Sequence, residues 1–223
     1  MANVIFEPVL GAVEEIAVGR PVVIAERVGQ GWEGDLVIAA ALATPTRVAF
    51  MVRHTSGFIC TTITDDDAER LRLPPMAYVP GERRFATCTV TVDASSGVST
   101  GISARDRALT LRLLADPGTN HEQLTRPGHM VPVRVHHAGV LHRAGRPEAA
   151  SDLARLAGVG PAVGFGAIVS ERQPTAMADL FELRAFCDRN GFPLVSVRDV
   201  AAYRMRDANA LSLPRTVSEP RVS

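Results

Sequence analysis

Hydrophobic residues follow two alternating spacings along the chain, one typical of helices and one typical of buried strands. Apolar residues recur every three or four positions over residues 6–18, and Gly19 ends this helical segment. The β-branched run over residues 21–25 then predicts a buried strand. The same reasoning predicts further strands over 36–40, 58–63, 87–92, 130–136, 163–169 and 194–197, and helices over 46–54, 65–73, 103–115, 148–157, 178–190 and 198–205.

These segments alternate without any repeat period. These strands and helices, some of the strands adjoining, predict an α+β fold with a mixed sheet and flanking helices rather than strict βαβ units. No internal boundary is visible, so residues 1–206 are expected to form one domain. The proline- and serine-containing residues 207–223 predict a flexible C-terminal tail. Residues 74–86, with three prolines and a glycine, predict a long loop of the kind that serves as a lid or binding loop.

The charge balance narrows the classes of function. The chain has 223 residues with 24 basic and 24 acidic side chains, and a sequence pI near 7.0. Nucleic-acid binding is not expected, because tracking phosphates needs a surplus of positive charge on one face. No run of about 18 apolar residues and no signal peptide is visible, so no membrane contact is expected. Three widely spaced cysteines indicate a reducing, cytoplasmic location.

Every basic residue is an arginine, and the chain contains no lysine. Schiff-base aldolases, pyridoxal-phosphate enzymes and P-loop nucleotidases each need a lysine amine at the reacting group or phosphate. These chemistries are therefore excluded. A phosphate site in this chain would have to use arginine and backbone N–H groups.

The segment 100–107 has the features of such a phosphate site. Gly101 lets the backbone approach a ligand, Ser103 caps the following helix, and Arg107 lies one turn into it. A helix N-terminus offers free N–H groups and positive potential to an anion. The alternative is a capped helix with no ligand.

A second candidate is the string Arg126-Pro-Gly-His129, in which a turn would direct a guanidinium and an imidazole. A plain structural turn is the alternative. Glu33 and Asp35 place two carboxylates on a predicted strand edge, and Glu148 starts a helix, where an acidic residue usually complements the helix dipole. His136 and His137 are expected on opposite faces of a strand, as ordinary surface or interface residues.

Six strings occur in order along the chain. They are WEGD at 32–35, RHTSGFIC at 53–60, TCTVTVDASSGVSTGISARDRALTLR at 87–112, TRPGHMVPV at 125–133, AGVLHRAGRPEA at 138–149 and DVAAYR at 199–204. Together they resemble the 3,4-dihydroxy-2-butanone 4-phosphate synthase family over nearly the whole chain. The resemblance implies a homodimeric enzyme that converts ribulose 5-phosphate to formate and a four-carbon precursor of riboflavin, with Mg²⁺ or Mn²⁺ as cofactor.

The resemblance also implies roles for residues at matching positions. Those that match the phosphate-binding pattern are Thr100, Ser103, Asp106, Arg107 and Arg126. Asp35 matches an acidic substrate contact, and Arg112 and Glu148 match residues that the family needs for catalysis. His129 matches the metal-binding histidine, and Glu33 matches the second glutamate of the acidic loop.

The acidic loop departs from the family pattern. Gln30 stands where the family has a substrate-binding arginine, and Gly31 where it has the glutamate that ligates the metal. Arg146 and Pro147 replace a histidine and a threonine near the substrate. Losing even an indirect metal partner lowers metal affinity or activity by about 10- to 100-fold. The expected function is therefore a divergent lyase or isomerase that works on ribulose 5-phosphate or a related anionic sugar through an enediol. A working synthase and a catalytically weak partner protein are the alternatives.

Overall fold

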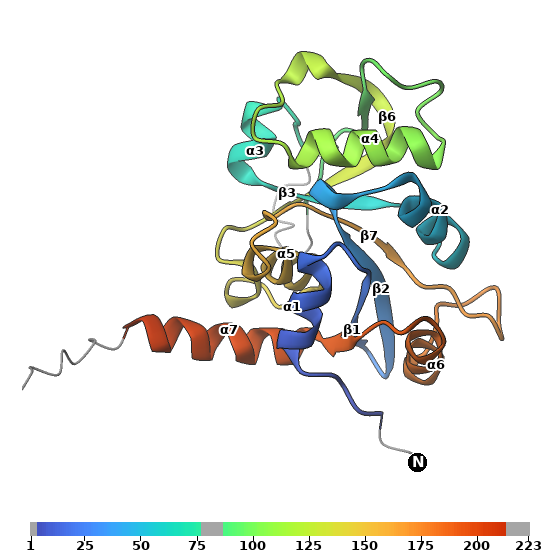
Figure 1. Ribbon diagram of the computed structural model, residues 1–223, viewed down its shortest axis with the longest axis vertical. Coiled ribbons are helices and arrows are strands. Elements are labelled where there is room, and N and C mark those ends of the chain that lie inside the picture. Colours follow the sequence, from blue (N-terminus) through green and yellow to red (C-terminus); the bar gives the residue numbers. More distant parts are fainter. Residues whose placement is uncertain (1–3, 77–86, 213–223) are drawn as a thin grey trace, which may run out of the picture.

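A mixed sheet with helices on both faces makes up the protein (Figure 1). The computed structural model describes residues 4–76 and 87–212, and for 207–212 only the backbone. The strand order is β4-β6-β3-β7-β2-β1-β8, and β5 pairs with β6 outside this path. The predicted single domain with a mixed sheet and flanking helices is confirmed.

The elements follow one another in the order that the hydrophobic pattern predicts. The strands are β1 (Val22–Val28), β2 (Gly31–Ala39), β3 (Cys60–Thr64), β4 (Thr87–Cys88), β5 (Val92–Ala94), β6 (Leu124–Val135), β7 (Val163–Ala167) and β8 (Leu194–Ser196). The α-helices are α1 (Val9–Ala17), α2 (Pro45–His54), α3 (Asp65–Arg70), α4 (Ala104–Ala115), α5 (Arg146–Leu156), α6 (Leu180–Asn190) and α7 (Val197–Ser212).

Both pairing directions occur in the sheet. The strands β1 and β2 form an antiparallel hairpin whose turn contains Gly29 at φ 58°. Strand β8 runs parallel to β1, and β3 runs parallel to β6. Strand β7 is antiparallel to both β2 and β3 and joins the two halves of the sheet.

The sheet is buried on both faces, which explains its continuous apolar strands. One core packs α1, α5 and α7 against one face through residues such as Ile16, Leu153 and Val200. The other packs α2, α4 and α6 against the opposite face through residues such as Met51 and Leu111. The N-terminal end of α5 thereby meets the β1–β2 hairpin.

Several boundaries differ from the prediction. Helix α7 continues to Ser212, so residues 207–212 are helical where the sequence predicted the start of a flexible tail. Residues 213–223 and most of the predicted 74–86 loop, from 77 on, lie outside the described residues. The predicted strand 87–92 is divided into β4 and β5, and β6 begins at Leu124 rather than 130.

The strand β6 also ends before the paired histidines. His136 and His137 follow Val135, and their ring centroids are 4.1 Å apart, while His142 stacks on His136 at 3.8 Å. The prediction that they lie on opposite faces of a strand is wrong, because the alternation of side chains ends with the strand.

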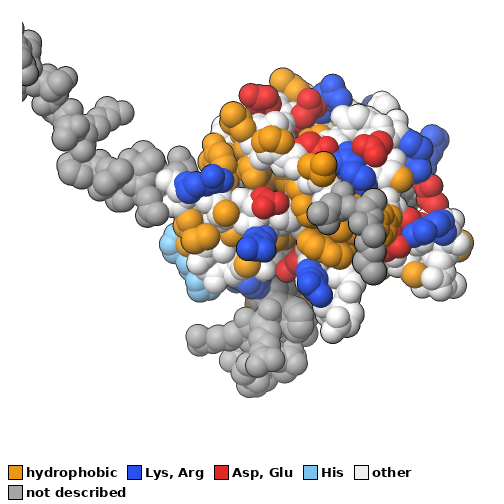
Figure 2. Space-filling model, turned by 90° about the horizontal axis from the view of Figure 1, so that it is seen from below, with side chains coloured by type: hydrophobic (Ala, Val, Ile, Leu, Met, Phe, Trp, Pro, Cys, Tyr) orange, Lys and Arg blue, Asp and Glu red, His pale blue; other side chains and the backbone are white. Residues whose placement is uncertain are grey.

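Charged side chains of both signs are interspersed on the face that Figure 2 shows, in keeping with the balanced composition. Among the helices that the structure describes, none has the length and apolar character needed to cross a bilayer.

Candidate active site

The β1–β2 hairpin carries a cluster of carboxylates. Residues 31, 33 and 35 lie on one face of β2 because side chains alternate along a strand. Glu26 of β1 lies directly opposite Glu33 in the register. Like charges at opposed positions destabilise a strand pair. This arrangement therefore requires a positive charge nearby.

Arg146 supplies that charge from the first position of α5. Its Nη2 lies 2.9 Å from Glu33 Oε2, its Nη1 3.3 Å from Asp35 Oδ1, and its Nε 3.6 Å from Glu26 Oε2. Each guanidinium nitrogen faces a different carboxylate. The side chain is 18% exposed, so the three ion pairs are only partly screened by water.

Asp35 is the most buried of the three carboxylates. Burial raises its pKa to about 6, although the Arg146 charge opposes the shift. Burial also raises the pKa of Glu26, again against Arg146. A carboxyl group that titrates near neutral pH is suited to acid–base catalysis.

Glu148 and Arg143 form a second ion pair beside this cluster. The Arg143 Nη2 donates to Glu148 Oε1, and the Glu148 side chain is almost completely buried. Glu148 Oε2 is buried and has no hydrogen-bond partner among the described residues. The pair lines a cavity of about 660 Å³ together with Glu26, Glu33 and Arg146, and the wall also includes Arg27, Cys60, Cys88 and Phe165. Asp35 contacts this wall through Arg146.

His129 belongs to a different cluster, which the β5–β6 pair positions. Its Nδ1 lies 2.6 Å from Asp93 Oδ2, and its backbone N–H donates to Asp93 Oδ1 at 2.9 Å. Gly101 packs against this pair with φ 86°, and a Cβ there would lie 1.9 Å from Asp93 Oδ2. Only glycine fits at this position.

The 100–107 segment folds around the buried Asp106. Its Oδ2 accepts hydrogen bonds from Ser99 N, Ser99 Oγ and Gly101 N. The bonds from Ser99 lower the pKa of Asp106. Ser103 accepts from Asp106 N, which confirms the predicted helix cap. Thr100 is exposed at the surface.

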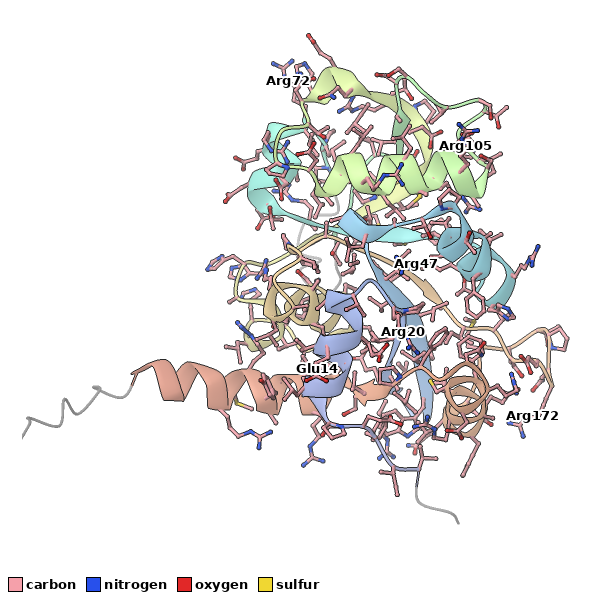
Figure 3. The ribbon with its side chains drawn as sticks, viewed as in Figure 1. Glu14, Arg20, Arg47, Arg72, Arg105 and Arg172 are labelled. Carbon is pink, nitrogen blue, oxygen red and sulfur yellow. The ribbon has the colours of Figure 1, made fainter. Side chains whose placement is uncertain are left out.

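Arg107 extends the cluster toward the start of β3. It is buried, and its Nη1 donates to Gly57 O at 3.2 Å. Burial lowers the pKa of Arg107, and the charge of Asp93 opposes this shift. Arg105, which marks the start of α4 in Figure 3, belongs to the exposed side of the same helix.

Three predicted site residues join neither cluster. Arg112, in the last turn of α4, donates to Ala43 O at 2.8 Å. The Arg126 guanidinium donates to the carbonyls of His121, Leu124 and Leu71. Gln30 is exposed in the hairpin turn.

Residues 126–129 lie within β6 but have no partners in β5: the register changes from Asp93↔Thr125 to Val92↔Met130, so the predicted turn takes the form of a bulge in the strand. Gly128 packs closely on β5: a Cβ there would lie 2.0 Å from the Val92 carbonyl carbon. The Arg126 guanidinium is held by backbone carbonyls.

The two clusters lie apart within one chain. Strands β3 and β7 separate His129 on β6 from Glu33 and Asp35 on β2. Three inter-strand steps of about 4.8 Å place the two backbones roughly 14 Å apart. Glu148 lines the cavity and Asp35 contacts Arg146 of its wall at 3.3 Å, but His129 does not join them. No three His, Cys, Asp or Glu side chains within residues 4–76 and 87–206 could hold a metal ion together. The predicted pairing of His129 with Glu33 as metal ligands is therefore not found in the single chain.

Sequence reasoning missed three functional candidates. Glu26 and Arg143 line the cavity, and Asp93 pairs with His129. Arg143 lies in the quoted string 138–149, three residues before Arg146, so its position was a usable signal. Asp93 and Glu26 gain their roles from strand pairing, which the sequence does not reveal locally.

Comparisons with known proteins point to one family. The family model for 3,4-dihydroxy-2-butanone 4-phosphate synthase matches residues 11–203. A riboflavin biosynthesis protein RibBA of Salinispora tropica is 49% identical over 202 residues, 91% of this chain and 50% of that protein. The RibBA of Rhodococcus erythropolis is 47% identical over 201 residues, 90% of this chain and 47% of that protein. The chain thus spans about half the length of the curated relatives it matches.

A solved structure shares the whole fold. The crystal structure of a 3,4-dihydroxy-2-butanone 4-phosphate synthase in complex with two magnesium ions has a TM-score of 0.84 and 34% identity, and the match covers 91% of this chain and 99% of that one. Fold, family model and sequence identity agree over nearly the entire chain. The protein belongs to the 3,4-dihydroxy-2-butanone 4-phosphate synthase family.

Proposed function

We propose that this chain acts on ribulose 5-phosphate in riboflavin biosynthesis and forms 3,4-dihydroxy-2-butanone 4-phosphate and formate. The 47–50% identity to riboflavin biosynthesis proteins supports this reaction over an unrelated one. Ribulose 5-phosphate contains the same carbon, hydrogen, oxygen and phosphorus atoms as the two products, counted as acids, taken together. The reaction therefore requires no oxidant or reductant.

One observation in the site carries the proposal. Glu148 is buried, has one carboxylate oxygen without a partner among the described residues, and lines a cavity of about 660 Å³. Asp35, with a pKa of about 6, lies 3.3 Å from Arg146 of the same cavity wall. A reaction through an enediol needs groups that take up and return protons near neutral pH. Arg143 and Arg146 line the same cavity, and guanidinium groups suit an anionic substrate.

We assign the residues as follows. Asp35 and Glu148 exchange protons with the substrate carbons and hydroxyls, and Arg143 holds an anionic group at the cavity wall. The Asp93–His129 pair and the 100–107 segment form a second polar surface on β6 and α4. In a homodimer, that surface of one copy could complete the cavity of the other.

A divalent cation does not fit the single chain as it is arranged. The carboxylates of the hairpin face Arg146 rather than a common empty point, and Gly31 offers no ligand. No step is therefore assigned to Mg²⁺ or Mn²⁺ here.

A second candidate function is the binding of a phosphosugar without turnover. The observation that favours it is the position of Arg146 within the acidic cluster, where it restrains Asp35. Formate release from ribulose 5-phosphate by the purified chain distinguishes the two. Saturable binding without formate would favour the second candidate, and neither binding nor formate would contradict both.

A further inference from the structure

Arg146 contacts all three acids of the cluster and donates a hydrogen bond to one of them, Glu33. Its Nη2, Nη1 and Nε face Glu33, Asp35 and Glu26 at 2.9, 3.3 and 3.6 Å. The three carboxylates come from two strands, and the arginine comes from a helix more than a hundred residues later in the sequence. This is a long-range arrangement in which one guanidinium holds three acids.

The cluster would be strongly repulsive without that guanidinium. Glu26 and Glu33 face each other across the hairpin, and Asp35 lies two residues further along β2. Two like charges about 4 Å apart interact by about 4 kcal/mol at the dielectric near a protein surface. A cation among the three acids, or a proton on one of them, relieves this repulsion.

A metal ion would compete with Arg146 for the same oxygens. Hard divalent cations need several oxygen ligands that converge on one point. Here the carboxylate oxygens lie around the planar guanidinium group of Arg146. No convergent group of three ligands exists in the part of the chain that the structure describes. Binding a metal would require Arg146 to leave and the carboxylates to turn inward.

The backbone itself would still admit a further acidic ligand. A Cβ at Gly31 would meet only Val28 O, at 3.9 Å, and it would project on the same face as Glu33 and Asp35. The restriction on metal binding thus lies in the side chains at positions 31 and 146 and not in the shape of the hairpin.

We propose that the Arg146 guanidinium is the resident cation of this site and takes the place of a divalent metal ion. The charge that organises Glu26, Glu33 and Asp35 is then built into the polypeptide. The site is preassembled at any metal concentration, and chelators leave it intact. This inference concerns charge and geometry, and it holds whether or not ribulose 5-phosphate is the substrate.

The test is Mn²⁺ binding to the full chain by calorimetry and by electron paramagnetic resonance. The wild-type chain should bind Mn²⁺ weakly. Arg146→Ala should bind it at least about tenfold more tightly, because three carboxylates lose their competing partner. Arg146→Gln keeps most of the side-chain volume and should show the same gain, whereas Arg146→Lys keeps the charge and should not.

The matched control is Arg184→Ala. Arg184 is 20% exposed and lies 2.6 Å from Glu7 and 2.9 Å from Asp188. Its removal frees two carboxylates in a partly buried setting elsewhere in the fold. It should leave Mn²⁺ affinity at the wild-type value.

A further variant keeps the test decisive if the single variants unfold. Gly31→Glu combined with Arg146→His supplies two metal ligands and should bind Mn²⁺ and raise the unfolding temperature when the ion is added. The proposal is overturned if the wild type already binds Mn²⁺ as tightly as the folded Arg146 variants. It is equally overturned if no folded variant gains affinity.

Discussion

At the residue scale, the chemistry of the cavity depends on Asp35. Its carboxyl group is 5% exposed, and burial outweighs the opposing charge of Arg146, so that its pKa rises to about 6 from an ordinary value of 3.8. The folded chain therefore holds the Asp35 proton more tightly than the unfolded chain does. Stability must then depend on pH in the interval between these two values.

Asp35→Asn should flatten this dependence. In the wild type, Asp35 lowers the free energy of unfolding as the pH rises from about 4 to about 6, by at most about 3 kcal/mol for a shift of roughly two units. Above that interval its contribution is constant. Denaturant unfolding of both proteins at several pH values measures the difference. Parallel curves for wild type and variant would contradict the assigned pKa.

Gly101 is a second residue whose identity is fixed by its surroundings. It has φ 86° and lies against Asp93 and His129. Gly158 has a similar φ of 72° but nothing within 4 Å of a built Cβ. The two glycines thus separate the cost of a left-handed backbone from the cost of a steric clash.

Gly101→Ala should destabilise the protein more than Gly158→Ala. Both variants pay the backbone cost of about 1 kcal/mol, and Gly101→Ala should add about 1 to 3 kcal/mol for the clash. Chemical denaturation gives both values. Equal losses of unfolding free energy would mean that the Asp93–His129 pair shifts without cost, and would contradict a rigid pair in the site.

At the element scale, helix α4 begins at a polar structure that the sequence partly reveals. The hydroxyl–acid spacing of Ser103 and Asp106 predicted a capped start, and the cap is present. The sequence did not reveal that Asp106 turns back to bind Ser99 and Gly101, because a side chain's choice of partner depends on the loop conformation.

Asp106→Ala should therefore cost more than Ser103→Ala. Ser103→Ala removes one capping bond, worth about 1 kcal/mol. Asp106→Ala leaves the N–H groups of Ser99 and Gly101 without their acceptor and should cost about 2 to 4 kcal/mol. Thermal unfolding of both variants provides the comparison. A larger loss of stability for Ser103→Ala than for Asp106→Ala would contradict the view that Asp106 holds this segment together.

Local signals explain how much of the fold could be predicted. The cap at Ser103 marks the start of α4 from neighbouring residues alone, and it was predicted correctly. The start of β6 could not be predicted, because Leu124 and Thr125 join the strand by pairing with β5 on the far side of the 126–129 bulge.

The same limit applies to the candidate site. Asp35 and Glu148 were recognised, but the link between Asp35 and the cavity runs through Arg146 and depends on the packing of α5 on the hairpin. Arg146 was identified as a departure from the family pattern. Its three ion pairs are contacts across more than a hundred residues, which one sequence does not encode locally.

At the scale of the whole molecule, the two polar clusters lie on separate parts of one sheet. Near the His129 cluster, Phe58 follows Gly57, the acceptor of Arg107, and Ile102 follows Gly101. Their exposed fractions are 61% and 51%. Large apolar side chains beside a polar cluster favour contact with a second copy. The predicted homodimer would cover them and could bring the clusters of two copies together.

Phe58→Glu should convert the dimer to a monomer. A charge at a buried apolar contact is costly, so the molar mass measured by light scattering after gel filtration should fall to that of one chain. Phe181→Glu, at an equally exposed position on α6 (54%), is the control and should leave the mass unchanged. A wild-type mass equal to one chain would contradict the homodimer.

The most direct measurement of the proposed function is formate release from ribulose 5-phosphate by the purified chain, with and without a chelator. Wild type should release formate in both conditions, and Asp35→Asn and Glu148→Gln should reduce the rate by at least about 100-fold. If the folded wild type releases no formate with or without Mg²⁺ or Mn²⁺, the proposed reaction is wrong.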